Sequence, residues 1–408
     1  MRYKLGILTT HPIQYQTPFF RKLAEHPELD VTVYFCSRYG AEEYKDEGFG
    51  RRLQWDLPLL EGYRHIFLRN WSPFNSIFTA PHGLVNPGVV KGMLGSSFDA
   101  FMIVGWSYAT HWMAYLYLRL RGVPILLFSE SSALERGRQS GILKGTRDIA
   151  LKQLFKRISA FLAVGTLNRQ FYLQHGVPAH KIFPVPYATN NDFWLGEAQR
   201  LRGQKAALRA ELGIPDESVV VLFSGKLIPR KRPMDLLQAF ASLGKGQAKA
   251  LVLAGDGELR PLLERYVREK SIESVYFAGF VNQSGLSRFY AMADLLVLPS
   301  SFEQWGLVLN EAMCFGLPVI ASDRVSAACD LIAHGENGYV FPAGDTTTLS
   351  QHLSDLMVDA EKRELMGRRS YECILKQNYE AGVEAVVAAL HSVVKRQQGM
   401  KTSEELHT

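Results

Sequence analysis

The chain alternates short aliphatic runs with amphipathic stretches, and this alternation occurs twice along its 408 residues. In the first half the aliphatic runs occupy residues 5–10, 31–36, 100–105, 125–130 and 161–164. Stretches with helical periodicity, such as 19–26 and 111–122, lie between several of them. Strands that alternate with helices form parallel sheets covered by helices on both faces. The first half therefore predicts an α/β domain with a parallel sheet.

The same pattern restarts near Val219. Strands are predicted over 219–225, 248–255, 275–280, 295–300 and 318–322, with helices over 233–243, 261–270, 286–293 and 307–315. A chain of this length suits two domains of roughly 150–200 residues. We expect a first domain over 1–195, a polar helical linker over 196–214, a second domain over 215–380, and a C-terminal helix with a polar tail over 381–408.

Composition sets the protein class without choosing a partner. A hydrophobic content of 47% can build full cores, and a charged content of 21% argues against disorder. The net charge of +6 is compatible with nucleic acid, an anionic membrane or a phosphorylated substrate. Charge alone does not choose among these partners; we expect no nucleic-acid partner.

The cysteines and the N-terminus bear on the compartment. Cys36, Cys314, Cys329 and Cys373 form no CxxC pair and no zinc spacing, which is typical of buried thiols in a reducing cytosol. The N-terminal run predicts a first strand instead of a signal peptide. No run of eighteen apolar residues occurs, so we expect a cytoplasmic protein whose membrane contact, if any, is peripheral.

The most informative loop covers residues 300–323. A strand ends at Ser300, and a helix is predicted to begin near Trp305-Gly306-Leu307, where unpaired backbone N–H groups attract anions. Glu303 precedes this helix and Glu311 follows eight residues later. A carboxylate can accept hydrogen bonds from two hydroxyls of a sugar or ribose. The two carboxylates therefore predict a site for an elongated, hydroxyl-bearing ligand.

Each carboxylate alone has a simpler explanation. Glu303 would favour the helix dipole, and Glu311 would be a solvated surface residue. The combination of strand, Glu, Gly, helix, Glu and Gly-x-Pro in one string favours the binding site.

A second loop, residues 224–233, follows the first strand of the second domain. Lys226 and Lys231 bracket a turn there, and two cations beside a helix start can hold a diphosphate. A solvated basic loop or a nuclear-localisation patch is the alternative for this PRKRP stretch. Its place after a buried strand favours the phosphate site. A third loop, GDGELRP over 255–261, lacks the third glycine of a dinucleotide fingerprint and predicts a tight turn.

Together these motifs make the second half resemble the donor domain of glycosyltransferase family 4, which has the GT-B fold. The matching motifs are Gly225-Lys226-Leu227 with Lys231, Ala254-Gly255-Asp256-Gly257, Phe277-Ala278-Gly279-Phe280-Val281, Glu303 to Glu311 with Gly316-Leu317-Pro318-Val319, and Asn337-Gly338-Tyr339-Val340-Phe341. The resemblance covers roughly residues 160–390. It implies two Rossmann-like domains facing a central cleft, with the acceptor bound by the first and the nucleotide-sugar donor by the second.

The resemblance also implies a role for each donor-site residue. Lys226 and Lys231 would bind the donor diphosphate, Glu303 the sugar hydroxyls and Glu311 the ribose. Gly225, Trp305, Gly306 and Leu307 would bring backbone groups to the sugar and phosphate, and Phe280 and Val281 would contact the base. The family usually has Arg at the first cationic position, so Lys226 keeps the charge but loses the bidentate fork.

The first half departs from the family pattern. A Gly-Gly loop usually follows the first strand, whereas this chain has His11-Pro12-Ile13-Gln14-Tyr15. A His often follows a later strand, whereas this chain has Ser129-Glu130. His11 and Glu130 are candidate catalytic or acceptor-binding residues; a loop histidine and a capping carboxylate are the alternatives. Tyr15, Trp106 and Trp112 are candidates for stacking on a sugar, although lone aromatics are more often core.

The expected activity is retaining transfer of a sugar from a nucleotide-diphosphate sugar, UDP- or GDP-linked, to an acceptor hydroxyl in polysaccharide or glycoconjugate biosynthesis. No Asp-x-Asp metal motif is present, so fixed positive charge is expected to replace a divalent ion, and no cofactor is expected. A non-catalytic partner of the same fold and a sugar-nucleotide epimerase are the alternatives.

The stretch from Arg119 to Arg157 is basic, and part of it mixes apolar residues with cations at near-helical spacing. It is compatible with docking on an anionic membrane near a lipid-linked acceptor. The alternative is an ordinary amphipathic helix that packs its apolar side on the sheet.

Overall fold

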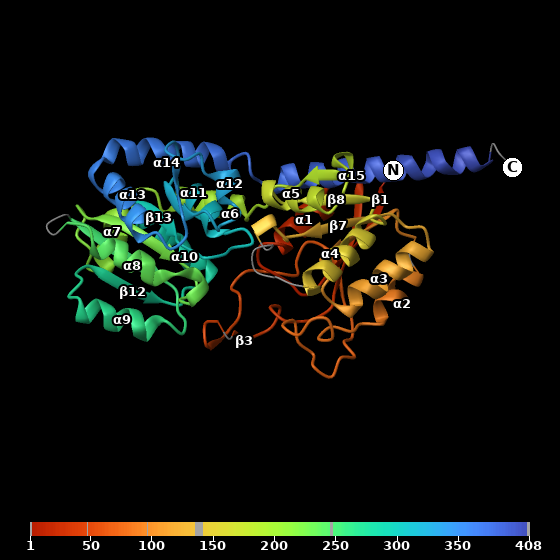
Figure 1. The fold of residues 1–408 in the computed structure, drawn as a ribbon, viewed down its shortest axis with the longest axis horizontal. Helices are drawn as coiled ribbons and strands as arrows, with labels where there is room; N and C mark the ends of the chain where they lie inside the picture. Colours follow the sequence, from red (N-terminus) through yellow and green to blue (C-terminus); the bar gives the residue numbers. More distant parts are fainter. Residues whose placement is uncertain (1, 47, 96, 135–141, 245–247, 406–408) are drawn as a thin grey trace. The chain divides into compact units, whose positions relative to one another are not determined.

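The computed structural model describes residues 2–46, 48–95, 97–134, 142–244 and 248–405 (Figure 1). The chain divides into two compact units. Unit 1 comprises residues 1–44, 58–187 and 379–408, and unit 2 comprises residues 45–57 and 188–378.

Unit 1 is built on a seven-stranded sheet in which every pairing is parallel. Its strands are β1 (Tyr3–Thr9), β2 (Leu29–Phe35), β5 (Arg64–Phe67), β6 (Ala100–Val104), β7 (Ile125–Ser129), β8 (Ala160–Ala163) and β9 (Ile182–Pro184), in the order β5-β2-β1-β6-β7-β8-β9. The central strands are buried on both faces, as expected for a parallel sheet between helices.

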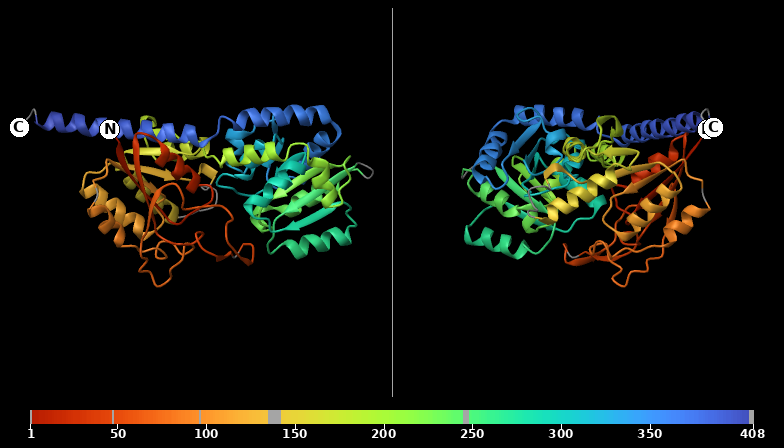
Figure 2. Two further views of the ribbon diagram at one scale, coloured as in Figure 1. Left: turned by 180° about the vertical axis from the view of Figure 1, so that it is seen from behind. Right: turned by 45° about the vertical axis from the view of Figure 1, so that its right-hand side comes forward.

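The helices of unit 1 are α1 (Thr17–Glu25), α2 (Gly88–Leu94), α3 (Ala109–Leu120), α4 (Ile142–Phe155), α5 (Thr166–Gln174) and α15 (Tyr379–Glu405). The C-terminal helix α15 returns to this unit and runs beside α1 and β8 (Figures 1 and 2). Lys22 pairs with Glu380 over 2.7 Å, and the Tyr379 hydroxyl donates to the Tyr15 carbonyl over 2.8 Å. The last helix of the sequence therefore completes the first unit.

Unit 2 is built on a six-stranded sheet, also parallel throughout. Its strands are β10 (Val219–Ser224), β11 (Lys249–Ala254), β12 (Val275–Gly279), β13 (Leu295–Leu298), β14 (Val319–Ser322) and β15 (Gly338–Phe341), in the order β12-β11-β10-β13-β14-β15. Strands β10, β11, β13 and β14 are almost wholly buried.

The helices of unit 2 are α6 (Asn191–Arg200), α7 (Lys205–Glu211), α8 (Pro233–Ala241), α9 (Arg260–Glu269), α10 (Gln283–Met292), α11 (Val308–Cys314), α12 (Ala328–Leu331), α13 (Thr346–Val358) and α14 (Ala360–Ile374). The segment expected to be a polar linker, 196–214, forms the end of α6 and all of α7, and both helices pack on α10. Arg209 of α7 is buried and pairs with Asp294 over 2.6 Å, so this connection is an integral layer of unit 2.

Two short strands, β3 (Tyr44–Asp46) and β4 (Arg51–Leu53), pair with each other in a separate two-stranded sheet. Residues 45–57 group with unit 2, although they lie between β2 and β5 in the sequence. No sequence pattern predicted that residues 45–57 of the first half would belong to unit 2.

The predicted fold class, two Rossmann-like α/β units with parallel sheets, is confirmed. The boundaries observed at residues 187/188 and 378/379 differ from the expected 195 and 380. The expected separate C-terminal element, residues 381–408, belongs to unit 1 because its apolar residues Val383, Val386 and Leu390 are buried there. The predicted cleft between the units stays a prediction.

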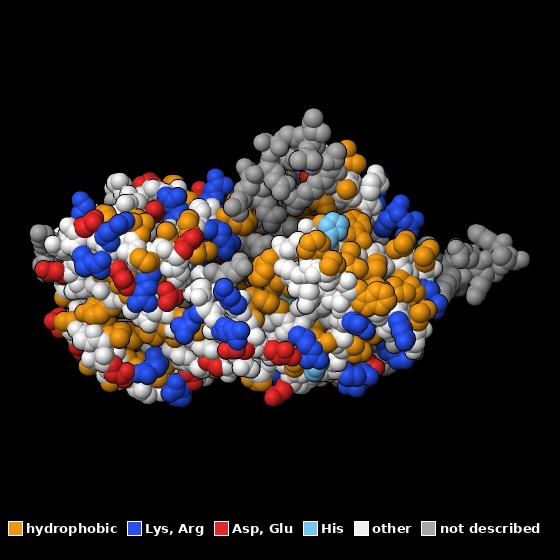
Figure 3. Space-filling model, turned by 90° about the horizontal axis from the view of Figure 1, so that it is seen from below, with side chains coloured by type: hydrophobic (Ala, Val, Ile, Leu, Met, Phe, Trp, Pro, Cys, Tyr) orange, Lys and Arg blue, Asp and Glu red, His pale blue; other side chains and the backbone are white. Residues whose placement is uncertain are grey.

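The surface of unit 1 exposes several large apolar side chains. Figure 3 shows hydrophobic side chains gathered on the part of the surface that this unit contributes. The loop between β5 and α2 exposes Trp71, Phe74 and Phe78. No helix in the described ranges is long and apolar enough to cross a membrane. The four cysteines are free thiols, and Cys36 and Cys314 are buried.

Candidate functional site

The two loops that the sequence predicts to bind a ligand lie at neighbouring strand ends of unit 2. β10 pairs with β11 on one side and with β13 on the other, so the order of the strands reverses there. Ligands of open parallel sheets bind at such a switch point, outside the carboxyl ends of the strands. The two loops contact each other, because the Ser301 N–H donates to the Arg230 carbonyl over 2.8 Å.

Lys231 and Glu303 form the centre of this arrangement. Lys231 ends a short 3₁₀ turn, Pro229–Lys231, and its ammonium lies 2.7 Å from Glu303 Oε1. The two side chains are only 13% and 10% exposed. The contact is a buried ion pair, and a carboxylate has about four acceptor positions, so acceptor capacity remains beside Lys231. A buried carboxylate of this kind is suited to accept a hydrogen bond from a ligand hydroxyl.

The backbone around Glu303 is fixed from both sides. The Glu303 N–H donates to the Arg324 carbonyl over 2.9 Å, and the Ser326 hydroxyl donates to the Glu303 carbonyl over 3.0 Å. Gly306 has a φ of 111°, and a Cβ there would lie 2.7 Å from Val325 Cγ1. A larger residue would strain this turn, so glycine keeps the loop in place and thereby the carboxylate.

Glu311 lies on α11, in the same part of unit 2. The Tyr290 hydroxyl donates to Glu311 Oε2 over 2.6 Å. Part of the Glu311 side chain reaches the surface, but protein surrounds its carboxyl, and this burial raises its pKa to about 7. The hydrogen bond from Tyr290 and the positive charge of Lys231 act in the opposite direction. Lys231 therefore acts electrostatically on both predicted carboxylates.

The predicted helix start differs in detail. α11 begins at Val308 and has seven residues. The Trp305 side chain is buried, and its indole N–H donates to Asn310 Oδ1 over 2.9 Å. Trp305 can thus offer a ligand only its backbone, together with the backbone of Gly306 and Leu307.

The glycines after β10 and β11 permit a close approach of two backbones. A Cβ on Gly255 would lie 1.8 Å from the Gly225 carbonyl oxygen, and one on Gly257 would lie 2.6 Å from that of Leu227. The Leu227 N–H donates to the Asp256 carbonyl over 2.8 Å. This packing explains the glycines of the 255–261 loop as a tight turn.

Lys226 pairs with a different carboxylate from Lys231. Its ammonium lies 2.7 Å from Asp46 Oδ1, and the side chains are 31% and 12% exposed. Phe280, the predicted base contact, is half-buried beside Phe49, with ring centroids 4.8 Å apart. Residues 45–57 thus contact Lys226 and Phe280, and sequence reasoning missed them. Val281 is half-buried next to Phe280.

In unit 1, His11 and Glu130 follow β1 and β7, and they have different neighbours. The Thr10 hydroxyl lies 2.8 Å from His11 Nδ1, and the Tyr39 ring packs edge-on to the imidazole. Burial lowers the His11 pKa to about 4, so the ring is neutral near pH 7. A neutral imidazole can hydrogen-bond a hydroxyl group but is a weak base.

Glu130 belongs to a buried hydrogen-bonded group. Its Oε1 accepts from Gln16 Nε2 over 3.3 Å and from the Tyr187 hydroxyl. Burial and the nearby Glu130 charge raise the pKa of Tyr15 and of Tyr187. This carboxylate orients neighbouring side chains, as a positioning residue would.

The aromatic candidates differ in exposure. Trp106 is half-buried and stacks on Phe171, with centroids 6.2 Å apart. Trp112 is 45% exposed on α3. Tyr15 packs edge-on against Tyr187. Trp106 and Tyr15 thus belong to packed aromatic groups.

A pocket of about 520 Å³ lies in unit 1, at the carboxyl ends of β2 and β5. Its lining includes Arg38, Tyr39, Tyr44, Arg69 and Asn70. Glu42 and Glu43 also line it, and Glu42 pairs with Arg38 over 3.1 Å. Hydroxyls, an amide and charges of both signs around a hollow at strand ends are suited to a polar ligand with hydroxyl groups.

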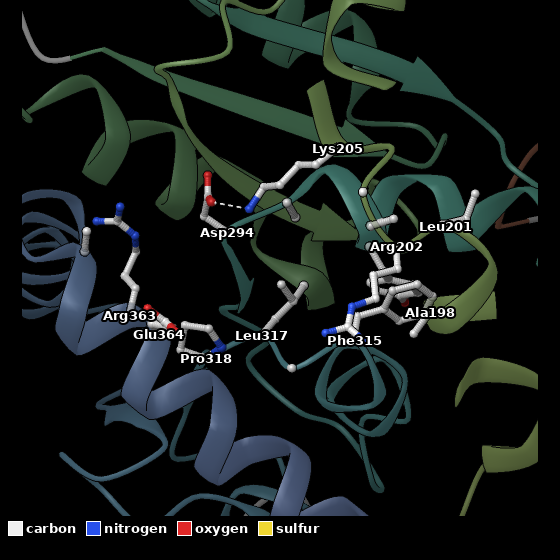
Figure 4. Close-up of a pocket in the computed structure, with 16 residues that line it drawn as sticks. Ala198, Leu201, Arg202, Lys205, Asp294, Phe315, Leu317, Pro318, Arg363 and Glu364 are labelled. Carbon is white, nitrogen blue, oxygen red and sulfur yellow. Dashed lines mark hydrogen bonds and ion pairs between the residues drawn. The ribbon is translucent and has the colours of Figure 1, made fainter. Parts of the chain in front are cut away.

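A second pocket, about 410 Å³, lies at the opposite edge of the sheet of unit 2, where β13 and β14 begin (Figure 4). Its lining includes Lys205, Asp294, Pro318 and Arg363. Lys205 is directed at Asp294, over 2.6 Å (Figure 4). Arg363 donates to the Leu356 carbonyl over 2.6 Å. Lys205, Asp294 and Arg363 thus bind other parts of the protein.

Two protein-family models match this chain. The model "Glycosyl transferase 4-like domain" matches residues 19–188, and "Glycosyl transferases group 1" matches residues 204–372. Each match covers most of one α/β unit, and the second contains both site loops. The chain belongs to the family 4 type of glycosyltransferases.

Curated relatives agree with this glycosyltransferase family. The chain is 34% identical over 171 residues to N-acetyl-alpha-D-glucosaminyl L-malate synthase of Bacillus anthracis, a match that covers 42% of this chain and 44% of that protein. It is 26% identical over 263 residues to alpha-D-kanosaminyltransferase of Streptomyces kanamyceticus, covering 63% and 67%. The first match thus spans less than half the length of that relative.

A solved structure is similar to this chain over almost its whole length. The crystal structure of Anabaena Alr3699/HepE in complex with UDP and glucose superposes with a TM-score of 0.71 at 18% identity. The superposition covers 96% of this chain and 100% of that chain. At this identity the likeness shows the shared fold, which is of the GT-B type.

Proposed function

We propose that this chain is a retaining glycosyltransferase that moves a sugar from a nucleotide-diphosphate sugar to an acceptor hydroxyl in polysaccharide or glycoconjugate biosynthesis. The observation that carries the proposal is the buried Lys231–Glu303 pair at the switch point of unit 2, beside the half-buried Glu311. A cation that pairs with one carboxylate and acts electrostatically on a second suits a ligand that carries both a diphosphate and sugar hydroxyls. That a fold relative was crystallised with UDP and glucose supports a UDP-sugar as donor.

In the proposed reaction the bond between the donor sugar C1 and the diphosphate oxygen breaks, and a bond from C1 to the acceptor oxygen forms on the same face. The acceptor proton passes to the leaving phosphate oxygen. Lys231 and Lys226 stabilise the negative charge that develops on that diphosphate. Glu303 accepts hydrogen bonds from the donor sugar, and Glu311 from the ribose. No residue of the chain is needed as a base in this scheme.

Metal independence is part of the proposal. The reasoning is that two fixed lysines supply the charge that a divalent ion would otherwise provide. The described residues contain no group of three or more His, Cys, Asp or Glu side chains placed to hold a metal ion. Addition of a chelator tests this point directly.

The acceptor side of the proposal rests on unit 1. The pocket at the ends of β2 and β5 offers Arg69, Asn70 and two tyrosines to a polar acceptor. His11, with its lowered pKa, would hydrogen-bond the acceptor as a neutral ring, and Glu130 would act through Tyr187 and Gln16. The acceptor is proposed to be a glycan, a lipid-linked sugar or a small hydroxylated molecule.

A peripheral contact with an anionic membrane, at the cytoplasmic face, is a further part of the proposal. On α4 and just after it, Lys152, Lys156 and Arg157 are exposed and Ile149 is 62% exposed. Leu151, Leu154 and Phe155 are buried in the core, as an ordinary amphipathic helix requires. Membrane docking would therefore depend on the cations and Ile149. The side chains of Lys144 and Arg147, and residues 135–141, lie outside the described part of the chain.

Product analysis tests the proposed function. Incubation with a UDP-sugar and a candidate acceptor should give an acceptor glycoside whose anomeric NMR coupling matches that of the donor. An inverted product would contradict retention. Conversion of the donor sugar without an acceptor would indicate an epimerase, and binding without turnover would indicate a non-catalytic partner.

A further inference from the structure

Residues 45–57, hereafter the strap, cover the two predicted contacts of the nucleotide in unit 2. The structure describes every residue of the strap except residue 47. The strap contains all of β4 and the part of β3 that follows Tyr44. Its turn reaches Lys226 and Phe280, which lie after β10 and β12. Under the proposed function, these residues hold the donor diphosphate and the base.

The contact with Lys226 is the most specific. Asp46 Oδ1 lies 2.7 Å from the Lys226 ammonium and also accepts from the Phe49 N–H over 3.0 Å. The ammonium lies 4.8 Å from the centre of the Phe49 ring. A Cβ on Gly48 would come within 2.7 Å of Lys226 Cδ and Nζ. The turn thus fits against the lysine, with a carboxylate as counter-ion and a glycine that leaves room for it.

The rest of the strap is held on the base side. Phe49 packs edge-on to Phe280, and the Arg51 guanidinium lies 5.1 Å from the Phe280 ring centre. Farther along, Asn282 Nδ2 donates to the Gln54 carbonyl over 2.8 Å, and the Ser284 N–H donates to the Asp56 carboxylate over 3.2 Å. The strap therefore runs from the diphosphate lysine to the loop that follows Phe280.

A diphosphate at Lys226 would compete with this contact. The Asp46 side chain is only 12% exposed, so a bound diphosphate would bring like charges together where water screens them little. The three N–H donors of Lys226 would be divided between the two anions, so each anion would be bound less strongly than it would be alone. Binding of the donor and docking of the strap then exclude each other in part.

We propose that Asp46 is an internal ligand of Lys226, which the diphosphate of the donor displaces, so that the strap occupies the donor site until a nucleotide releases it. The proposal rests on the proposed function, because it needs Lys226 to bind a diphosphate. It makes Asp46 a residue that sets the affinity for the donor. Removing its charge frees Lys226 for the nucleotide.

The first test compares the affinity for UDP, GDP, ADP and dTDP, measured by calorimetry, in the wild type and in Asp46→Asn. Asparagine can still accept from the Phe49 N–H, so the turn is preserved while the charge is lost. If the strap leaves Lys226 free for about a tenth of the time, the wild type binds a nucleotide about tenfold more weakly than a protein whose Lys226 is always free. The nucleotide that binds the wild type best should therefore bind Asp46→Asn on the order of tenfold more tightly than the wild type. Glu273→Gln removes an exposed carboxylate elsewhere in unit 2 and should leave the affinity unchanged.

A second variant and a second measurement make the test independent of folding defects. Gly48→Ala crowds the Lys226 ammonium without changing charge, and it should also tighten nucleotide binding. Lys45, Arg51 and Arg52 make the strap a trypsin substrate once it is released, so UDP should speed cleavage there in the wild type.

The outcomes separate the two proposals. Unchanged or weaker nucleotide binding in both variants, or protection of the strap from trypsin by UDP, overturns the displacement while leaving the proposed function intact. Binding of none of the four nucleotides by the wild type or by Asp46→Asn overturns both.

Discussion

The Lys231 ammonium lies 2.7 Å from Glu303 Oε1, and the two residues come from loops that follow different strands, β10 and β13. The pair is buried, with the two side chains only 13% and 10% exposed. In the proposed reaction the lysine serves the diphosphate and the carboxylate serves the sugar. The pair therefore joins the two parts of the donor between which the bond breaks.

Replacing Lys231 tests the cationic half. Lys231→Ala should weaken binding of a nucleoside diphosphate by at least about 2 kcal/mol, or about thirtyfold in Kd, because a buried anion loses its partner. Calorimetric titration measures the effect. Arg230→Ala, which removes the neighbouring exposed cation, is the matched control and should bind normally. Equal affinities in both variants would remove Lys231 from the site.

The pH dependence of donor binding tests Glu311. Because the pKa of Glu311 is raised to about 7, this side chain is mostly ionised only above that pH. The ionised carboxylate can accept hydrogen bonds from both ribose hydroxyls. Affinity for a UDP-sugar, whose diphosphate does not titrate in this range, should therefore fall as the pH drops from about 8 to about 6. Glu311→Gln should make the affinity weak and independent of pH. A wild-type profile that is flat over this range would argue against the assignment.

The same shift affects stability. At pH values between the ordinary pKa of a glutamate and about 7, Glu311 carries a proton more often in the folded protein than in the unfolded chain. The free energy of unfolding therefore decreases as the pH rises through this range. At pH 8 and without ligand, Glu311→Gln should unfold at a higher temperature than the wild type. Lower stability of the variant would show that burial does not dominate at Glu311.

Chelation tests the fixed-charge account of catalysis. Because Lys226 and Lys231 are proposed to neutralise the leaving diphosphate, sugar transfer should proceed at an undiminished rate in excess EDTA. The rate of UDP release with acceptor present is the measurement. Loss of activity with EDTA that magnesium or manganese restores would mean that a metal ion supplies this charge.

Liposome sedimentation tests the proposed membrane contact. Anionic vesicles should sediment the wild type at low salt and release it at high salt, whereas neutral vesicles should not bind it. Lys152→Glu with Lys156→Glu should abolish the binding, because both side chains are exposed on this surface. Failure to bind anionic vesicles at low salt would favour a soluble acceptor.

The sequence predicted both sheets and the loops of the donor site for a definite physical reason. Buried parallel strands are short apolar runs, and turns with Gly, Pro or charge end them, so each loop could be placed after its strand. Only the structure shows that β10 and β13 are neighbours in the sheet, and this pairing explains why Lys231 contacts Glu303. The resemblance to the family had indicated roles for both.

The strap and the C-terminal helix could not be placed in the same way. Residues 45–57 are charged and glycine-rich without alternation, and their partners, such as Lys226, lie about 180 residues away in the sequence. The sequence predicts the helix at α15, but only contacts such as that of Lys22 with Glu380 assign this helix to unit 1. Long-range contacts of this kind leave no local pattern.

The central claim is that unit 2 binds a nucleotide sugar at Lys231, and thermal unfolding with UDP-, GDP-, ADP- and dTDP-sugars tests it most directly. A ligand that binds the native state raises the apparent Tm by mass action. The account predicts that at least one of these donors raises the Tm of the wild type and of Arg230→Ala but not that of Lys231→Ala. No shift with any donor, or an equal shift in all three proteins, would contradict it.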